Sequence, residues 1–255
     1  MFSVADLICG TNTVSTNGDM NGLARRFRDD IEEIDTILFA SVSLRAGVPS
    51  WAVMPFLMRK FLELSATSLL FRLDPLRVLA ARKNQLHSSY ETGRQSASSI
   101  AWTGDIFPGD RATTQDIWDA ALLKKGPERS LLGWHVGNVA IVPGLQSLGD
   151  AGVGSSTWLA KLADIENPFE WIKGQLSQLY STFSKGIHAE YLLDDQNAFD
   201  QASIEQHLSD VYMVVGILAA ATHYSPLFSK SLSHDDALRA MLDVEEGYFR
   251  RIGNT

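Results

Sequence analysis

A lysine, a histidine and a glutamate lie within six residues of one another in the C-terminal half of the chain. Lys185, His188 and Glu190 belong to the stretch YSTFSKGIHAEYLLDD, which spans residues 180–195. A histidine with charged groups beside it can exchange protons with a substrate, provided that a partner lies within hydrogen-bond reach and a cleft admits the substrate. The stretch therefore contains a candidate for general acid–base catalysis.

A helix sends these side chains in different directions. At about 100° per residue, His188 lies off the apolar stripe by about a third of a turn. It continues a row of small hydroxyl side chains, formed by Ser177, Ser181 and Ser184. Glu190 lies near the edge of the apolar stripe, where an unpaired carboxylate is costly. We expect Glu190 to form a structural ion pair with Arg59 and His188 to pack or cap; the alternative is an active site.

Two further candidates lie on the helix predicted over residues 50–73. Arg59 and Glu63 are four residues apart, so they face the same way. Most of this helix is apolar, with hydrophobic residues on two sides, which is typical of a helix surrounded by neighbours. Arg59 and Glu63 lie in its narrow polar sector and join the lysine, histidine and glutamate above as candidate site residues.

Two segments carry most of these residues: MRKFLELSATSLLFRLDP, residues 58–75, and LYSTFSKGIHAEYL, residues 179–192. Together they resemble helical proteins of bacterial abortive-infection and phage-defence loci, many of which are HEPN-like helical bundles. In such families an Arg-x-x-x-Glu-like helix pairs with a later helix that bears a Ser-x-x-x-His-like element. The resemblance implies a helical component of a prokaryotic defence or toxin system that acts through protein contacts, with a protein partner or as a homodimer.

The same resemblance leaves a catalytic alternative open. HEPN ribonucleases typically carry an arginine followed a short distance later by a histidine, and both residues act on the RNA phosphodiester at a dimer interface. The chain has this spacing in RKNQLH, Arg82 to His87, and in RSLLGWH, Arg129 to His135. The alternative is therefore a metal-independent ribonuclease active as a dimer, with Arg82 and His87 as its catalytic pair.

Charge and motif content limit the partners and cofactors. The 255 residues carry a net charge of −8, which argues against a general nucleic-acid coat. Residues 51–94 nevertheless hold seven Arg or Lys and three Asp or Glu, and RNA could bind there. The six histidines show no zinc-ligand spacing, and the glycine-rich GDAGVGSS lacks the lysine of a phosphate loop. We expect no cofactor and no metal.

Cysteine content and hydropathy bear on location. A single cysteine, Cys9, cannot form an internal disulfide, which fits a reducing cytoplasm. The strongest apolar run, VYMVVGILAAA over residues 211–221, is too short to cross a bilayer. We expect a buried core helix there, no membrane partner and a cytoplasmic protein.

Helical patterns bracket a middle region of different texture. We expect residues 1–255 to form a single, mainly α domain, with N-terminal helices over 20–90 and C-terminal helices over 167–252. Between them, residues 93–160 hold ten of the nineteen glycines and four of the six tryptophans. This composition predicts an irregular insertion of turns, short extended pieces and one short helix near 115–125. The fold class is thus a multi-helix bundle with a Gly/Trp-rich irregular insertion.

Capping residues predict where the helices begin. An apolar stripe at three- and four-residue steps indicates a first long helix over about 21–46. Asp74 before Pro75 predicts the start of a helix that runs towards residue 87. Three further helices are expected to start at caps of the same kind. These caps are Asn167, Ser203 and Ser233.

Overall fold

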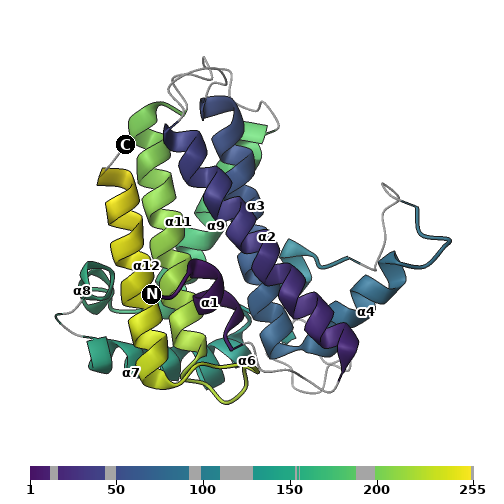
Figure 1. Ribbon diagram of the computed structural model, residues 1–255. Helices are drawn as coiled ribbons and strands as arrows, with labels where there is room; N and C mark the ends of the chain where they lie inside the picture. Colours follow the sequence, from purple (N-terminus) through teal and green to yellow (C-terminus); the bar gives the residue numbers. More distant parts are fainter. Residues whose placement is uncertain are drawn as a thin grey trace.

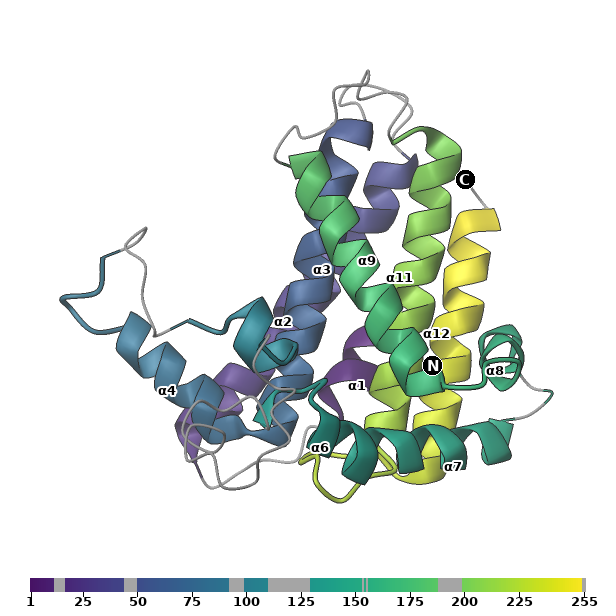
Figure 2. The same ribbon diagram turned by 180° about the vertical axis from the view of Figure 1, so that it is seen from behind.

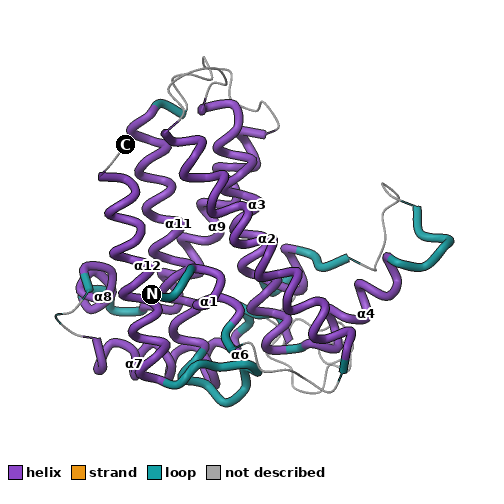
Figure 3. The backbone as a smooth tube through the Cα atoms, in the orientation of Figure 1, coloured by secondary structure: helices purple, strands orange, loops and turns teal. Residues whose placement is uncertain are grey.

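Helices make up nearly all of the regular structure (Figures 1 and 3). The computed structural model describes residues 1–11, 17–43, 50–91, 99–109, 129–152, 154, 156–187 and 199–253. Within these ranges the only β-type pairing is an isolated bridge between Thr103 and Phe107. The predicted mainly α fold is confirmed.

Five long helices form the bundle. They are α2 (Gly18–Ser43), α3 (Ser50–Leu73), α9 (Pro168–Ile187), α11 (Gln201–Thr222) and α12 (His234–Gly253). Residues 211–222 of α11 are all buried, which confirms the predicted core helix. Seen from the two sides in Figures 1 and 2, α11 runs alongside α12 and α9. In the part of the chain that the structure describes, no helix has the length and apolar character needed to span a membrane.

The N-terminal half confirms the predicted periodicity. The apolar stripe of α2 is buried throughout; it consists of Leu23, Phe27, Ile31, Ile34, Leu38 and Val42. The short helix α1 (Val4–Cys9) packs against α2, α11 and α12. The helix α4 (Pro75–Gln85) begins as predicted, because the Asp74 side chain accepts a hydrogen bond from the Arg77 amide at 3.0 Å. Figures 1 and 2 show α4 projecting away from the long helices.

Two of the three predicted caps in the C-terminal half are confirmed. The Asn167 side chain accepts from the Glu170 amide at 3.2 Å, and the Ser233 hydroxyl accepts from the Asp236 amide at 3.2 Å. The third prediction was wrong, because α11 begins earlier than Ser203. Its cap is Asp200, whose carboxylate accepts from the Ser203 amide at 2.8 Å and so places Ser203 inside the first turn.

The middle region is more helical than predicted. Residues 134–152 form a continuous rod of α6 (Trp134–Val136), the π-helical turn η3 (Gly137–Ile141) and α7 (Val142–Gly152). The helix α8 (Thr157–Ala163) follows, and the irregular turn η1 (Trp102–Ile106) precedes them. Figure 2 shows α7 lying across the lower ends of the long helices. The short helix predicted near 115–125 lies outside the described residues.

Turns and short extended pieces were predicted for the middle region, whereas residues 134–144 are helical, and two glycines explain the difference. A Cβ on Gly137 would lie 2.3 Å from the Phe169 ring, and one on Gly144 would lie 2.2 Å from the carbonyl oxygen of Ala221. Both glycines therefore sit where a helix approaches its neighbour closely, which requires a residue without a side chain. Glycine marks close packing here rather than a turn.

Candidate functional site

A cleft of about 490 Å³ lies between α2, α3 and α4. Each helix contributes four lining residues at the spacing i, i+3, i+4 and i+7. They are Leu23, Arg26, Phe27 and Asp30 from α2; Lys60, Glu63, Leu64 and Thr67 from α3; and Val78, Ala81, Arg82 and Gln85 from α4. Ser99, Ile100, Trp102, Ile106 and, from α9, Tyr180 complete the lining. We call this cleft the three-helix groove.

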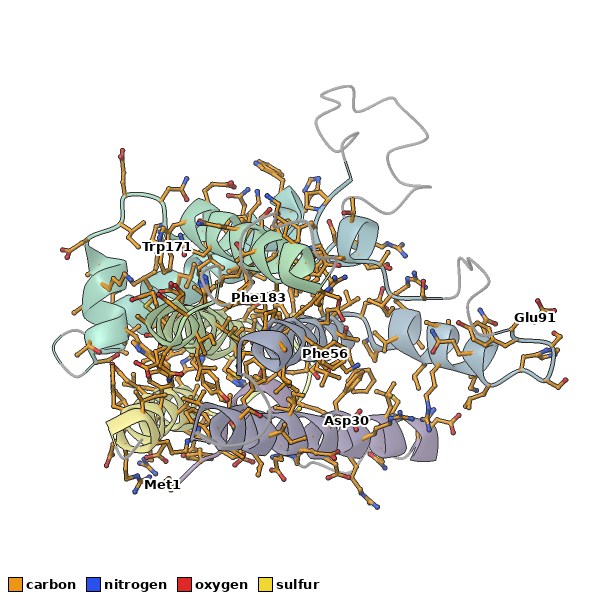
Figure 4. The ribbon with its side chains drawn as sticks, turned by 90° about the horizontal axis from the view of Figure 1, so that it is seen from above. Met1, Asp30, Phe56, Glu91, Trp171 and Phe183 are labelled. Carbon is orange, nitrogen blue, oxygen red and sulfur yellow. The ribbon has the colours of Figure 1, made fainter. Side chains whose placement is uncertain are left out.

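The groove follows from the amphipathic pattern of its walls. On each helix, residues at this spacing form one stripe along the surface. The apolar members of the stripes are buried and form the floor; they are Leu23, Phe27, Leu64, Val78 and Ala81. The polar members stand at the rim, where they meet solvent. Figure 4, seen from above the bundle, labels Asp30 on α2 and Glu91 beyond the end of α4.

A chain of contacts fixes the aromatic side of the groove. The Arg59 guanidinium donates to Glu63 Oε1 at 3.1 Å and to the Tyr180 hydroxyl at 2.8 Å. It also lies 4.6 Å from the centroid of the Tyr180 ring. The Trp102 ring stacks on Tyr180 with 4.1 Å between centroids and 7° between planes. Arg59 therefore holds Glu63, Tyr180 and, through it, Trp102 in place.

The structure brings together part of the first predicted site. Arg59 and Glu63, which a spacing of four places on the same side of α3, form an ion pair, and Glu63 lines the groove. Lys185 is exposed in the last turn of α9 and does not line the groove. His188 and Glu190 lie outside the described residues, and so does the predicted ion pair between Glu190 and Arg59.

The row of serines that leads towards His188 is not covered by a neighbouring helix over its first part. Ser177 and Ser181 are exposed on α9, and the Ser184 hydroxyl donates to the Tyr180 carbonyl of its own helix at 2.7 Å. The neighbours of α9 pack on its apolar stripe, which lies on another side of the helix from Ser177 and Ser181.

The arginine–histidine pairs of the alternative have separate surroundings. Arg82 lines the groove, and its Nη1 lies 3.5 Å from the Asp19 carbonyl oxygen. His87 is exposed in the turn after α4, with Nδ1 2.7 Å from the Ser89 hydroxyl, and does not line the groove. Arg129 and His135 are both exposed.

The basic stretch over residues 51–94 is divided by the fold. Half of its six described cations are neutralised, since Arg59 pairs with Glu63, Arg77 with Asp105 at 2.8 Å, and Lys83 with Asp19 at 3.3 Å. Arg72 is buried, and Arg94 lies outside the described residues. Lys60 and Arg82 remain at the rim of the groove, and no carboxylate in the described part of the chain forms an ion pair with either.

Arg72 belongs to a buried polar cluster that the sequence did not reveal. Its guanidinium donates to the backbone oxygens of Ile8 at 3.2 Å and Ser229 at 3.0 Å. It also contacts three side chains, the Thr222 and Ser231 hydroxyls at 2.9 and 3.2 Å and the His223 Nδ1 at 2.9 Å. Burial lowers the pKa of Arg72 to about 9. Within the described residues no carboxylate pairs with it.

His223 is the second member of this cluster. Its Nδ1 accepts from Arg72 and from the Leu232 amide at 3.1 Å, so Nε2 carries the proton and donates to the Leu7 carbonyl at 2.7 Å. Burial, together with the charge of Arg72, lowers the pKa of His223 to about 3. The imidazole is therefore neutral, and both of its nitrogens are occupied by the protein itself, which indicates a structural role.

Other chemistry has little support in the described residues. Burial raises the pKa of the Cys9 thiol to about 11, which keeps it protonated and unreactive. No group of three or more His, Cys, Asp or Glu in the described part of the chain is arranged to hold a metal ion.

Comparisons with known proteins add no relative. The chain matches no family model, no curated protein and no solved structure.

Proposed function

We propose that this protein is a helical component of a prokaryotic defence or toxin system and that it acts by binding a protein partner. The three-helix groove carries the proposal. Three walls that each present residues at i, i+3, i+4 and i+7 resemble a helical bundle with one position unfilled. A helix from another chain would occupy that position, which is one of the common modes of peptide recognition.

The composition of the groove supports binding over catalysis. Its described lining contains no histidine and no cysteine. Both of its acids are paired with arginine, Asp30 with Arg26 at 3.5 Å and Glu63 with Arg59 at 3.1 Å. A general base must be free to accept a proton from a substrate. Paired carboxylates serve instead to set the charge pattern of a binding surface.

The ribonuclease alternative has less support. It requires Arg82 and His87 to act on one phosphodiester, whereas Arg82 faces the groove and His87 lies in the exposed turn beyond it. RNA binding over residues 51–94 would draw on cations of which several already have acidic partners. Nucleic-acid binding needs cations that can replace the counterions of the phosphates.

The defence context rests on the resemblance of two segments. These segments lie mainly on α3 and α9, and the two helices pack side by side (Figure 2). The hydrogen bond from Arg59 to Tyr180 joins them. The resemblance implies contact between an Arg-x-x-x-Glu helix and a later helix, and the packing of α3 against α9 supports the proposal in this respect.

Two assays separate the proposed function from its alternative. In the first, the purified protein is incubated with labelled RNA without metal. In the second, the molar mass of the protein is measured by light scattering, alone and after coexpression with the products of neighbouring genes. We expect intact RNA and a stoichiometric protein complex that the double substitution Lys60→Glu, Arg82→Glu disrupts. Cleavage of RNA that His87→Ala abolishes, without loss of folding, would establish the ribonuclease instead.

A further inference from the structure

We infer that the three-helix groove binds an amphipathic helix that carries acidic residues beside its apolar stripe. This inference rests on the proposed function and deepens it by stating the chemistry of the partner. Its basis is the shape of the groove and the distribution of charge along its rim.

The dimensions of the groove fit about two turns of a helix. Each wall extends over eight residues, and its seven steps at a rise of 1.5 Å per residue correspond to about 10 Å. A helix that presents apolar side chains at i, i+3 or i+4, and i+7 spans the same length. The partner is thus held by a short row of apolar anchors rather than along a long helix.

The floor and one side of the groove are suited to such anchors. Leu23, Phe27 and Leu64 lie at the floor, and the partly exposed rings of Trp102 and Tyr180 form the aromatic side. Aromatic rings supply large apolar contact area with few rotatable bonds, so little conformational entropy is lost when a partner covers them. Because Tyr180 is fixed by Arg59 and Trp102 stacks on Tyr180, this side is already ordered without a partner.

The charges at the rim determine which charge the partner helix should carry. Asp30 and Glu63 are paired with arginines, whereas Lys60 on α3 and Arg82 on α4 form no ion pair within the described residues. Cations left without a counter-charge favour carboxylates on the partner. The chain as a whole carries a charge of −8, which does not favour acidic proteins in general, so the preference depends on local cations such as Lys60 and Arg82.

A nucleic acid fits the same surface less well. Asp30 and Glu63 lie on the lining, where they would face phosphates, and the floor between them is apolar. Protein surfaces that follow a phosphate backbone present a continuous basic track. The alternation of acids, cations and apolar residues in the groove is instead that of a protein interface with a hydrophobic centre and a polar rim.

The experiment uses a displayed library of helical peptides. Each peptide has leucine at i, i+3 and i+7, with Glu, Lys and Gln varied at the flanking positions, and selection is carried out on the full chain. We expect enrichment of peptides with flanking Glu. A selected peptide, made synthetically, should bind about tenfold or more weakly to the Lys60→Glu, Arg82→Glu variant, because two favourable contacts become repulsive. Selection on that variant should favour Lys instead.

Matched variants isolate the groove. Lys83→Glu makes the same charge change on α4, next to Arg82 but outside the lining, and should leave peptide affinity within about twofold. Thr67→Trp fills the groove without a change of charge and should abolish binding. Circular dichroism and thermal unfolding of each variant verify that the fold is retained before binding is compared.

Each of the other possible outcomes contradicts either the inference, the proposed function or both. If the selected peptides show no preference for Glu and still lose binding to the Thr67→Trp variant, the partner is not acidic, and the proposed function is retained. Self-association of the chain through the groove, lost in the same variants, would identify a second copy as the occupant and overturn the inference. If no peptide is enriched, or if peptides bind the groove variants as well as the parent, both the inference and the proposed function are wrong. RNA that binds through Lys60 and Arg82 would likewise contradict both.

Discussion

At the scale of single residues, Arg72 shows how a buried cation is stabilised with no carboxylate partner among the described residues. Its acceptors lie at helix ends, since Ile8 is in the last turn of α1 and Thr222 is the last residue of α11. The C-terminal end of a helix carries a partial negative charge on its unpaired carbonyl groups. Two helix ends and the loop after α11 thus surround the guanidinium with oxygen atoms, and the His223 Nδ1 adds a nitrogen acceptor.

Replacement of Arg72 by lysine should destabilise the fold. Lysine keeps the charge but has three donors instead of a planar fork of five, so some of the buried acceptors lose their partner. Each one costs about 1–3 kcal/mol, and we expect a loss of about 2 kcal/mol or more in the free energy of unfolding, measured with urea. The matched control is Arg25→Lys on the exposed surface of α2, expected to change stability by less than about 0.5 kcal/mol. Equal effects of the two substitutions would contradict a structural role for Arg72.

The pKa of His223 predicts a pH dependence of stability. The folded value is about 3 against an ordinary value of 6.5, so between these pH values the unfolded chain binds a proton that the folded chain does not. Stability therefore rises with pH across this window and decreases as the pH is lowered. From pH 6.5 to 5.0, where most carboxylates remain ionised, His223 should account for a loss of about 1.5 kcal/mol.

Urea unfolding of the parent and of His223→Gln at several pH values measures this contribution. In His223→Gln, the free energy of unfolding should depend less on pH, by the contribution of His223. His207→Gln serves as the comparison, because burial also lowers the pKa of His207 and adds to the slope in the same direction. An unchanged slope in His223→Gln would show that the pKa of His223 is the same in the folded and the unfolded chain.

Local relations between residues can be predicted from the sequence, whereas relations between distant residues cannot. The spacing of four places Arg59 and Glu63 on the same side of one helix, and in the structure they form an ion pair. The partners of Arg72 are separated from it by 64 residues at Ile8 and 150 at Thr222, and no local pattern connects them. One signal was present: Arg72 continues a row of residues at three- and four-residue steps on the buried side of α3. The row consists of Leu62, Ser65 and Leu69.

At the scale of elements, periodicity and caps were sufficient for the long helices. The stripes of α2, α3 and α9 and the caps at Asp74, Asn167 and Ser233 mark helices that the structure contains. The helices over residues 134–152 were missed because glycine lowers helix propensity. There, packing against α9 and α11 selects glycine and overrides the propensity, as Gly137 and Gly144 demonstrate.

Alanine substitutions at two glycines should have opposite effects. Gly144→Ala would place a methyl group 2.2 Å from the Ala221 carbonyl oxygen, so α7 must move away from α11, at a cost of about 1–3 kcal/mol. Gly174 lies within α9 with nothing near its Cβ position, so Gly174→Ala should stabilise by up to about 1 kcal/mol through helix propensity. Thermal unfolding of both variants measures the difference, and a stabilising Gly144→Ala would refute close contact between α7 and α11.

At the scale of the whole molecule, the groove depends on the arrangement of three separate segments. Arg59, Glu63 and Arg82 were candidates from the sequence. The sequence did not indicate that Glu63 on α3 and Arg82 on α4 line the same cleft. That relation is set by the direction in which α4 leaves the bundle after Asp74 (Figure 1). Helix directions depend on packing between elements, which a single sequence does not express.

The position of α1 couples the two halves of the bundle. It packs against α2 and α3 of the N-terminal half and against α11 and α12 of the C-terminal half. Leu7 and Ile8 are completely buried, and their carbonyl groups accept from His223 and Arg72. The Phe2 amide also donates to the Asp243 carboxylate of α12 at 2.7 Å. One short helix thus supplies both core side chains and partners for the buried polar cluster.

Deletion of residues 1–11 should therefore destabilise the whole molecule rather than only its edge. Burial of each large apolar side chain contributes about 1.5–3 kcal/mol, so loss of Leu7 and Ile8 alone removes roughly 3–6 kcal/mol. Natural domains are stable by only about 5–15 kcal/mol, and the unpaired cluster adds a further cost. We expect a strong decrease in the urea midpoint or loss of cooperative unfolding, followed by circular dichroism. Ser3→Ala, which removes only the cap of α1, should cost about 1 kcal/mol and keep the transition cooperative. A deletion that unfolds like the Ser3→Ala variant would mean that the long helices pack without α1.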